Sequence, residues 1–495
     1  MVRHEERVER PTHPEKTSAD PLIAKGDWGS VFDRMRSDDI RRIRVVWADQ
    51  HGVSRTKVVT SRAFPKICSE GLRCNLGTLL SDSSGRTIMD PFTPERVLDR
   101  PEFAGAPDLV LCPDPSTFRV LPWARQTGWV IADLATTAGE PLSFSSRAQL
   151  RAAVDLASQS DVRPVVGIEL EFHLMRVADQ ASTGPTESIG ACAVRPTHSG
   201  YQHQSEAALD NVSDFLDVLQ EHLEELDLPI RTLEVECGPS QFEISLDVLG
   251  AMEAADAAFL VKNAAKMIAR RHGYHITFMA RPTSQGFCSS GWHLHLSITD
   301  ALGQNLFVPK DDRELLSEYG RHFVGGILRN AREATLLTVP TVTGYKRLKP
   351  HSLAPDRVTW AEDNRGAMIR VTGDRKLGST HIENRVGDPA ANGYLYIASQ
   401  ILTGLDGISK GEEPPPPTKA PYEDDSIRLP TSLPEAITAF EASELFLKTM
   451  GEDFVTFYAA HKRSEAARFA ASELGRTTEP SEVSTWEQLE YFDFY

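Results

Sequence analysis

The chain has 495 residues, enough for two domains, and its 40% hydrophobic and 25% charged residues are typical of a soluble globular protein. The net charge of −17 disfavours nucleic acid and anionic membranes as partners. No apolar run reaches membrane-spanning length, no signal-like segment follows the charged N-terminus, and the six cysteines show no C-x-x-C pairing. These features predict a cytoplasmic protein with reduced thiols.

Composition and strand-like alternation in the N-terminal part of the sequence predict an arm followed by a small domain. Residues 1–25 are polar and charged, which is typical of a mobile arm. Residues 43–49 and 55–59 alternate like the two strands of a hairpin, with Asp49 at its tip. We predict a mobile arm over residues 1–25, a small mixed domain over residues 26–140 and a larger domain over residues 141–495.

Helices and strands alternate along the larger domain, which predicts an α/β or α+β architecture. Helical spacing predicts helices over residues 145–158, 213–226, 247–271, about 314–330, 390–405 and after residue 433. Strands are expected over residues 165–174, 274–280 and 292–298, as a strand pair or a strand with a turn over 233–246, and with loops in 340–385.

The expected strand over residues 165–174 carries two glutamates on one face. Because side chains alternate along a strand, Glu169 and Glu171 point to the same side. Two carboxylates on a buried face repel one another and lose hydration, and a divalent cation such as Mg²⁺ or Mn²⁺ offsets both costs. For an isolated E-x-E pair, a solvated edge strand is the more common explanation.

Two further motifs offer ligands for such a cation. Glu236 and Glu243 flank a Gly-Pro turn that lets the chain double back, although a polar turn with solvated glutamates has the same pattern. His293, His295 and Ser297 share one face of a strand whose other face is apolar. A lone strand histidine is usually a core residue, but a pair at this spacing favours a metal or phosphate site.

Cationic residues gather further along the larger domain, at Lys346-Arg347, Asn364-Arg365, Arg370 and Arg385. Charge runs are usually solvated, but apolar residues alternate with Arg370, which is typical of a partly buried guanidinium group. Such groups bind carboxylate and phosphate. Carboxylates for divalent ions together with arginines for phosphates are what phosphoryl transfer from ATP requires. No Walker A motif is present, which argues against a P-loop fold.

The order of these motifs resembles that of the glutamine synthetase family over roughly residues 40–470. The shared motifs are Gly167-x-Glu169-x-Glu171-Phe172, Glu236-x-Gly238-Pro239-x-Gln241-x-Glu243, Gly291-x-His293-x-His295-x-Ser297, Tyr345-Lys346-Arg347-Leu348, Asn364-Arg365 with Ile369-Arg370, and Glu383-x-Arg385 with Asp388-Pro389-Ala390-Ala391-Asn392. The resemblance implies an α+β fold, with an N-terminal β-grasp domain and a catalytic domain whose curved antiparallel sheet is surrounded by helices. It also implies a homo-oligomer, a dodecamer of two hexameric rings with active sites between subunits.

The resemblance further implies a role for each matching residue. One Mg²⁺ or Mn²⁺ would be held by Glu171, Glu236 and Glu243, and a second by Glu169, His293 and Glu383. ATP would be contacted by His295, Ser297 and Arg370, glutamate by Arg347 and Arg385, and the transferring phosphoryl group by Arg365. Asp49 of the adjacent subunit would lie at the amine site. ATP would phosphorylate the γ-carboxylate of glutamate, and an amine would then attack the γ-glutamyl phosphate.

The chain departs from glutamine synthetases on the amine side of this expected site. Leu353 stands where the family has a glutamate that closes over ammonium, Trp292 replaces a methionine, and Cys288-Ser289 replaces Asn-Gly in the glutamate-binding loop. Residues 354–365 look most like the γ-glutamylamine ligases, such as the γ-glutamylpolyamine and γ-glutamylanilide synthetases. Ser289 is a further candidate substrate contact, and Cys288-Ser289 leaves open whether the acid is glutamate itself.

Leucine can neither stabilise ammonium nor accept its proton, and it favours an amine with an apolar body. Leu353 and Trp292 would line that amine pocket. We therefore predict an ATP-dependent ligase that forms a γ-glutamyl amide from glutamate and an apolar or aromatic amine such as aniline. The alternatives are a γ-glutamylpolyamine synthetase, a glutamine synthetase that uses ammonia, and a non-catalytic relative, which the intact set of metal ligands disfavours.

Overall fold

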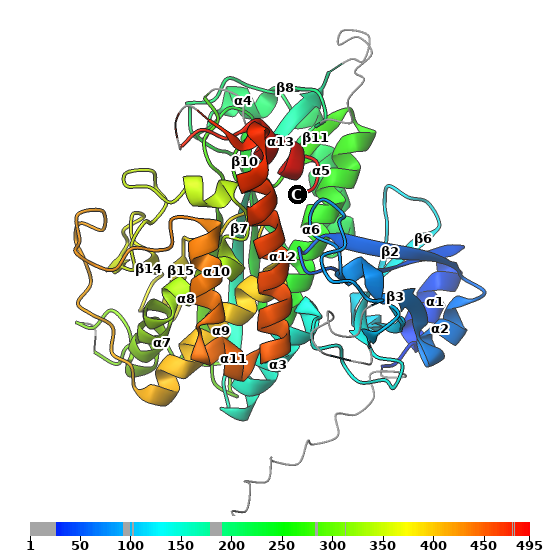
Figure 1. The fold of residues 1–495 in the computed structure, drawn as a ribbon, viewed down its shortest axis with the longest axis horizontal. Coiled ribbons are helices and arrows are strands. Elements are labelled where there is room, and N and C mark those ends of the chain that lie inside the picture. The colour runs from blue at the N-terminus through cyan, green and yellow to red at the C-terminus, as the bar shows by residue number, and fades with distance from the viewer. Residues whose placement is uncertain are drawn as a thin grey trace, which may run out of the picture.

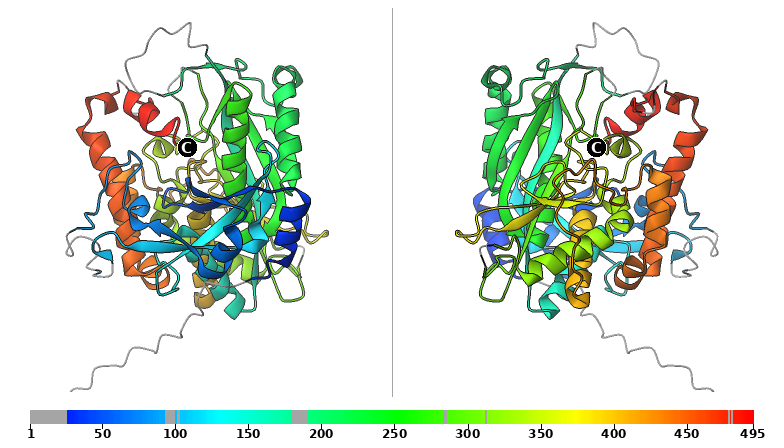
Figure 2. Two further views of the ribbon diagram at one scale, coloured as in Figure 1. Left: turned by 90° about the vertical axis from the view of Figure 1, so that its right-hand side faces the viewer. Right: turned by 90° about the vertical axis from the view of Figure 1, so that its left-hand side faces the viewer.

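The structure is a computed structural model that describes residues 26–92, 100, 103–178, 191–282, 286–311, 313–477, 479 and 481–495. The arm expected over residues 1–25 lies outside these residues. Figures 1 and 2 show a smaller unit, built from the blue and cyan part of the chain, beside a larger unit in which helices surround a sheet. The boundary expected at residue 140 stays a prediction.

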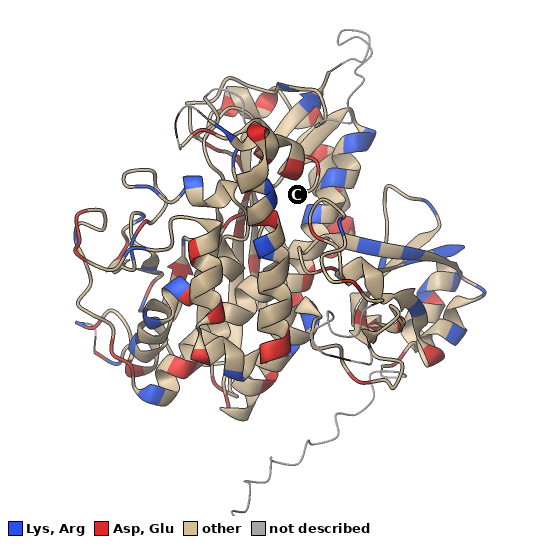
Figure 3. Cartoon of the chain, in the orientation of Figure 1, with Lys and Arg blue, Asp and Glu red and all other residues tan. Residues whose placement is uncertain are grey.

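The smaller unit is built on a six-stranded sheet with the order β2-β1-β6-β4-β3, and β5 pairs with β6. Its elements are α1 (Gly29–Ser37), β1 (Arg42–Ala48), β2 (Ser54–Thr60), α2 (Phe64–Glu70), β3 (Leu72–Asn75), β4 (Asp108–Pro113), β5 (Arg119–Val120) and β6 (Thr127–Ala135), with short 3₁₀ turns η1 (Leu76–Leu79) and η4 (Pro115–Thr117). The predicted hairpin is confirmed, because β1 pairs antiparallel with β2. Cationic residues mark the edge strand β2 as blue bands in Figure 3.

The larger unit contains a nine-stranded sheet with the order β13-β14-β15-β12-β7-β10-β9, and β8 and β11 also pair with β7. Its strands are β7 (Arg163–Val177), β8 (Val194–Pro196), β9 (Ile230–Val235), β10 (Gln241–Gly250), β11 (Tyr274–Thr277), β12 (Trp292–Thr299), β13 (Trp360–Glu362), β14 (Ile369–Thr372) and β15 (His381–Asn384). The expected α+β fold is confirmed. The expected antiparallel sheet needs one correction, since the edge pair β13–β14 is parallel.

Strand β7 organises this sheet because its two faces differ. Val166, Ile168, Leu170 and Phe172 are buried in the hydrophobic core. Helices α3 and α6 pack against this strand, and α6 also packs against β10. Alternation along the strand therefore directs the intervening glutamates to the other face of the sheet.

The helices of the larger unit are α3 (Ser146–Gln159), α4 (Glu206–Asp210), α5 (Ser213–Glu225), α6 (Ala251–Arg271), α7 (Glu318–Arg329), α8 (Ala331–Thr338), α9 (Gly393–Lys410), α10 (Leu433–Glu441), α11 (Glu444–Thr449), α12 (Glu452–Ala471) and α13 (Thr485–Tyr491), with 3₁₀ turns η6 (Thr343–Lys346) and η7 (Glu473–Gly475). Several predicted boundaries are wrong by a few residues: the helix predicted over residues 390–405 is Gly393–Lys410, and the strand predicted over residues 274–280 ends at Thr277. Helix α6 begins at Ala251 rather than Asp247, because β10 continues to Gly250, which caps the helix.

All six cysteines are free thiols, as expected from their spacing. Within the residues that the structure describes, no helix is long and apolar enough to cross a membrane.

Candidate active site

Strand register brings the acidic motifs together on one face of the larger sheet. β10 pairs with β7 so that Glu243 lies opposite Glu171. On the other side of β7, β12 pairs so that His293 lies opposite Glu169. Motifs from three separate parts of the sequence thus become neighbours, because adjacent strands lie only about 5 Å apart.

Glu169 lies at the centre of this group. One of its carboxylate oxygens is 3.3 Å from His293 Nδ1, and the other is 3.1 Å from His295 Nε2. Strand β15 adds Glu383, whose carboxylate lies 3.6 Å from His293 Nδ1. Two sets of possible metal ligands result, each with its ligand atoms within 4.8 Å of one another: Glu169, Glu243 and His293, and Glu169, His295 and Glu383.

These two sets differ in part from those that the family resemblance implies. Glu171 accepts a hydrogen bond from Gln241 Nε2 at 2.8 Å, and Glu236 lies 3.4 Å from His203 Nε2. His295 joins the ligand set of Glu169, although the resemblance assigns it to the nucleotide. The division of the carboxylates between two cations therefore stays a prediction.

The donor set fits divalent cations. Burial, with the nearby charge of Glu236, raises the pKa of Glu171 to about 8. Burial, with the charge of Glu169 and its neighbours, raises the pKa of Glu243 to about 10. His295 Nε2 is buried and makes no aligned hydrogen bond. Crowded carboxylates beside imidazole nitrogens are the groups that a hard divalent cation compensates.

The acidic face opens into a cavity of about 880 Å³. The expected site residues that line it are Glu169, Glu171, Glu236, Glu243, Ser289, His293, Arg347, Leu353, Arg365, Arg370, Glu383 and Arg385. The expected metal ligands, the expected substrate-binding arginines and Leu353 thus share one cavity.

Backbone carbonyl groups orient the two arginines expected to bind glutamate. Arg347 is buried and donates to the carbonyl oxygens of Val386, at 2.7 Å, and Arg385, at 2.8 Å. Arg385 donates to the carbonyl oxygen of Arg365 at 3.0 Å and to the carboxylate of Glu383. Both guanidinium groups are therefore fixed beside the acidic set before a substrate carboxylate arrives.

The residues expected at the nucleotide are only partly grouped around the cavity. Arg370 lines it and donates to Glu383 at 3.0 Å and to Asp363 at 2.8 Å. His295 and Ser297 follow His293 along the same face of β12, but neither is part of the cavity wall.

Leu353 occupies the cavity wall in a left-handed backbone conformation. Its φ is 60°, a region in which the Cβ of any residue other than glycine is crowded, and 61% of its surface is exposed. Its carbonyl oxygen accepts a hydrogen bond from Arg385 at 3.4 Å. Tyr422 donates to the carbonyl oxygen of Ala354 at 3.3 Å and lies beside the ring of His351. These contacts hold an apolar side chain at the cavity.

Trp292 does not line the cavity, contrary to the expectation for the amine pocket. It precedes His293 by one residue, so it lies on the core face of β12 with Leu294. Its side chain is fully buried, with the ring of Tyr396 at 5.6 Å and Lys262 Nζ at 5.7 Å. We therefore leave Trp292 out of the amine pocket.

Asp49 is also absent from the cavity wall of its own chain. Instead, Asp49 has hydrogen-bond partners within its own hairpin. Its buried carboxylate accepts hydrogen bonds from Arg55 Nε at 2.8 Å and from the backbone N–H groups of His51 and Val53, both at 2.9 Å. Asn392 Nδ2 donates to its carbonyl oxygen at 3.2 Å.

Some cavity residues escaped the sequence-based prediction. Gln241 had a usable signal, because it precedes Glu243 by two residues and so shares its face of β10. His203, Arg281 and Lys349 lie outside the regular strands and helices, where no periodicity indicates direction.

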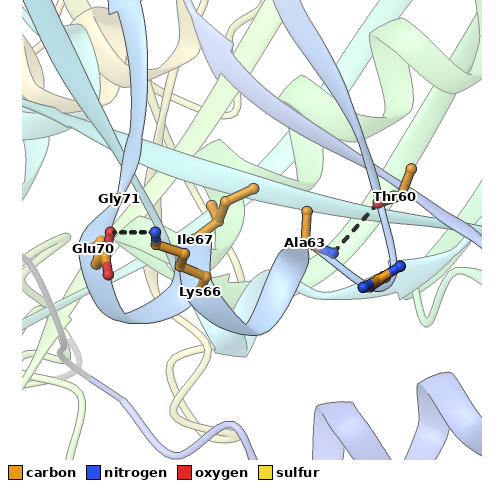
Figure 4. Close-up of a pocket in the computed structure, with 7 residues that line it drawn as sticks. Thr60, Ala63, Lys66, Ile67, Glu70 and Gly71 are labelled. Carbon is orange, nitrogen blue, oxygen red and sulfur yellow. Dashed lines mark hydrogen bonds and ion pairs between the residues drawn. The ribbon is translucent and has the colours of Figure 1, made fainter.

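A hollow of about 420 Å³ on the smaller unit lacks comparable chemistry (Figure 4). Thr60 Oγ1 accepts a hydrogen bond from the Ala63 N–H at 3.3 Å, and Lys66 lies 3.6 Å from Glu70. The charged residues that line it are exposed, so water can satisfy them.

A third possible ligand group, Cys192, His275 and Asp493, lies apart from the cavity. Arg270 Nη1 approaches Cys192 Sγ to 3.0 Å, and this fixed positive charge disfavours a cation there.

Comparison with known proteins assigns this fold and site to a class. The family model described as the catalytic domain of glutamine synthetase matches residues 143–483. The chain belongs to the glutamine synthetase family and is a glutamate–amine ligase, as its motifs predicted. Membership of the family implies ATP and divalent metal ions, in agreement with the carboxylate and histidine clusters.

Two relatives and one solved structure are similar to this chain over most of its length. Gamma-glutamylanilide synthase from Acinetobacter sp is 41% identical over 97% of each chain. Glutamate–isopropylamine ligase from Pseudomonas sp is 31% identical over 94% of this chain and 97% of the relative. A solved structure described as a GmaS/ADP complex has a TM-score of 0.74 and 26% identity, and the match covers 89% of this chain and 96% of that chain.

Proposed function

We propose that this protein joins the γ-carboxylate of glutamate to an apolar or aromatic amine, such as aniline, through γ-glutamyl phosphate. The observation that carries the proposal is Leu353, an apolar side chain exposed to a cavity otherwise lined mainly by charged and polar residues. The similarity to a gamma-glutamylanilide synthase and to a glutamate–isopropylamine ligase supports an organic amine over ammonia.

In the first step, an oxygen of the γ-carboxylate attacks the γ-phosphorus of ATP, and ADP leaves. Arg347 and Arg385 bind the substrate glutamate, while His295, Ser297 and Arg370 contact the nucleotide. Arg365 is exposed, and its guanidinium group makes no hydrogen bond or ion pair with any described residue, which suits a group that must follow the transferring phosphoryl.

The six proposed metal ligands are Glu169, Glu171, Glu236, Glu243, His293 and Glu383. When bound there, Mg²⁺ or Mn²⁺ would neutralise the negative charge of the phosphates.

In the second step, the amine nitrogen attacks the acyl carbon, the bond to phosphate breaks, and the nitrogen passes its proton to Asp49 of the neighbouring subunit. Leu353 offers a cationic amine no partner, so such an amine would lose hydration at a cost of several kcal/mol. An apolar body instead gains about 25 cal/mol for each Å² buried. An aromatic amine is uncharged near neutral pH, so it needs no base before it attacks.

The proposal includes a homo-oligomer of two hexameric rings in which Asp49 serves a neighbouring site. Its support is the absence of Asp49 from the cavity of its own chain. To act at the neighbouring site, the Asp49 carboxylate must break its hydrogen bonds with Arg55 and with the backbone of the hairpin. A purely structural role for Asp49 is the alternative.

A panel of amines tests the proposed reaction. ADP and phosphate release are measured with glutamate and either aniline, alkylamines, putrescine or ammonium. We expect the highest kcat/KM for aniline or an apolar alkylamine. Highest activity with putrescine or ammonium would instead identify a polyamine ligase or a glutamine synthetase, and no turnover with any amine would favour a non-catalytic relative.

A further inference from the structure

A second cavity, of about 510 Å³, lies beside the active-site cavity. Its apolar wall comes from Leu433 and Pro434 at the start of α10 and from Ala466 and Phe469 on α12. These two helices pack against each other at the front of the larger unit in Figure 1. The cavity therefore offers a small molecule an apolar surface formed by two helices.

Two lysines separate this cavity from the active site, because Lys346 and Lys349 line both. Lys346 Nζ is paired, at 2.5 Å from a carboxylate oxygen of Glu487. Lys349 is half-buried, and its ammonium group makes no hydrogen bond or ion pair with any residue in the described part of the chain. Burial, with the charges of Arg281 and Lys346, lowers the pKa of Lys349. An anion beside Lys349 would relieve this repulsion.

We propose that this cavity binds a small carboxylic acid with an apolar, ring-sized body, and that the bound acid is an effector of the neighbouring active site. The apolar body lies against α10 and α12, and the carboxylate pairs with Lys349. The binding site stands independently of the reaction, whereas the effect on kinetics rests on the proposed function.

The two cavities are coupled through charge and through the chain. A carboxylate that neutralises Lys349 on one side removes positive charge from the active-site wall, where glutamate and ATP are anions. The chain segment that carries Lys346 and Lys349 also carries Arg347 and Leu353, which line the active-site cavity. The bound acid should therefore raise the KM for glutamate severalfold and then reach a plateau, since a separate site weakens glutamate binding by a fixed factor.

Calorimetric titration of the full protein, without substrates, tests the site. The probe is 3-phenylpropionate, compared with its neutral amide, 3-phenylpropanamide, and with propionate, which lacks the ring. We expect 3-phenylpropionate to bind at least tenfold more tightly than either. Equally tight binding of the amide would contradict the proposed ion pair between the carboxylate and Lys349. If 3-phenylpropionate does not bind at all, the proposed site is overturned. The result does not depend on which reaction the protein catalyses.

A pair of variants on α12 locates the ligand. Ala470 is exposed and lines the cavity, whereas Ala467 is exposed and does not. Ala470→Trp should fill the cavity, weaken binding at least tenfold and abolish the rise in the KM for glutamate, while the KM without ligand stays unchanged. Ala467→Trp should behave as the wild type.

Undiminished binding to Ala470→Trp would place the ligand elsewhere and overturn the proposal. In the kinetic assay, a KM that rises without limit would indicate competition in the active site, and an unchanged KM would remove the effector role. If no amine supports turnover, the calorimetric comparison of the two variants still decides the binding site.

Discussion

Glu243 lies directly opposite Glu171 across the β7–β10 pair, on the face of the sheet that lines the active-site cavity. Like charges at directly paired positions destabilise a sheet. Burial raises the pKa of both side chains, with the charge of Glu236 acting on Glu171 and the charges of Glu169 and Glu171 acting on Glu243. This pair of glutamates destabilises the protein without metal, and a bound cation would remove that cost. The pairing therefore supports a metal-binding role.

The first prediction concerns Glu243→Gln. Chelation should abolish turnover, and this variant should lower turnover at least a hundredfold, because a neutral amide is a weaker metal ligand. In chelator, its Tm should equal or exceed that of the wild type, since repulsion is removed. Added Mg²⁺ or Mn²⁺ should raise the Tm of the wild type more than that of the variant. Equal metal-induced shifts would remove Glu243 from the metal site.

The second prediction distinguishes two roles of Asp49. If active sites lie between subunits, mixing inactive Asp49→Ala chains with inactive Arg365→Ala chains should restore activity, because some sites then combine two intact partners. Activity is compared with unmixed controls after subunit exchange. No recovery, together with a lower Tm for Asp49→Ala, would support the structural role that its hydrogen bonds with Arg55, His51 and Val53 indicate.

The third prediction concerns acid stability. His461 is fully enclosed on α12, and burial lowers its pKa to about 4. The unfolded chain, with a histidine pKa near 6.5, takes up a proton first as the pH falls. The contribution of His461 to stability should therefore be complete above pH 6.5 and decrease by roughly 3 kcal/mol towards pH 4.

Denaturant unfolding between pH 7.5 and 4.5 measures this dependence, with His461→Gln as the control. The variant should lose less stability than the wild type as the pH falls. Parallel pH profiles for the two proteins would show that His461 does not bind its proton on unfolding.

Strand alternation explains why much of the site was predictable. It indicated that Glu169 and Glu171 share one face of their strand, and that His293 and His295 share one face of theirs, before any pairing was known. The same rule places Trp292 on the core face, and the replacement of a family methionine was a misleading guide to its position.

Tertiary contacts that sequence spacing does not encode explain the remaining differences. Arg55 returns to Asp49 only because the hairpin folds back on itself. Lys349 and Arg281 reach the cavity from loops, whose direction depends on packing rather than on periodicity. The boundary of α6 moved because β10 continues to Gly250 before the helix begins.

The last prediction concerns Leu353, which determines the proposed amine preference. Leu353→Glu places a carboxylate at the cavity wall, where it can stabilise ammonium and accept a proton. Leu353→Met keeps an apolar side chain of similar volume and serves as the matched control. Leucine and methionine are both unbranched at Cβ, so the positive φ at position 353 strains them similarly.

The most direct measurement is the ratio of kcat/KM for aniline to kcat/KM for ammonium in the wild type and these two variants. We expect the ratio to exceed one in the wild type, to change little in Leu353→Met, and to fall at least a hundredfold in Leu353→Glu. Such a fall corresponds to a relative change of about 3 kcal/mol in transition-state binding. A wild-type ratio below one, or an unchanged ratio in Leu353→Glu, would contradict the assignment of an apolar amine to this site.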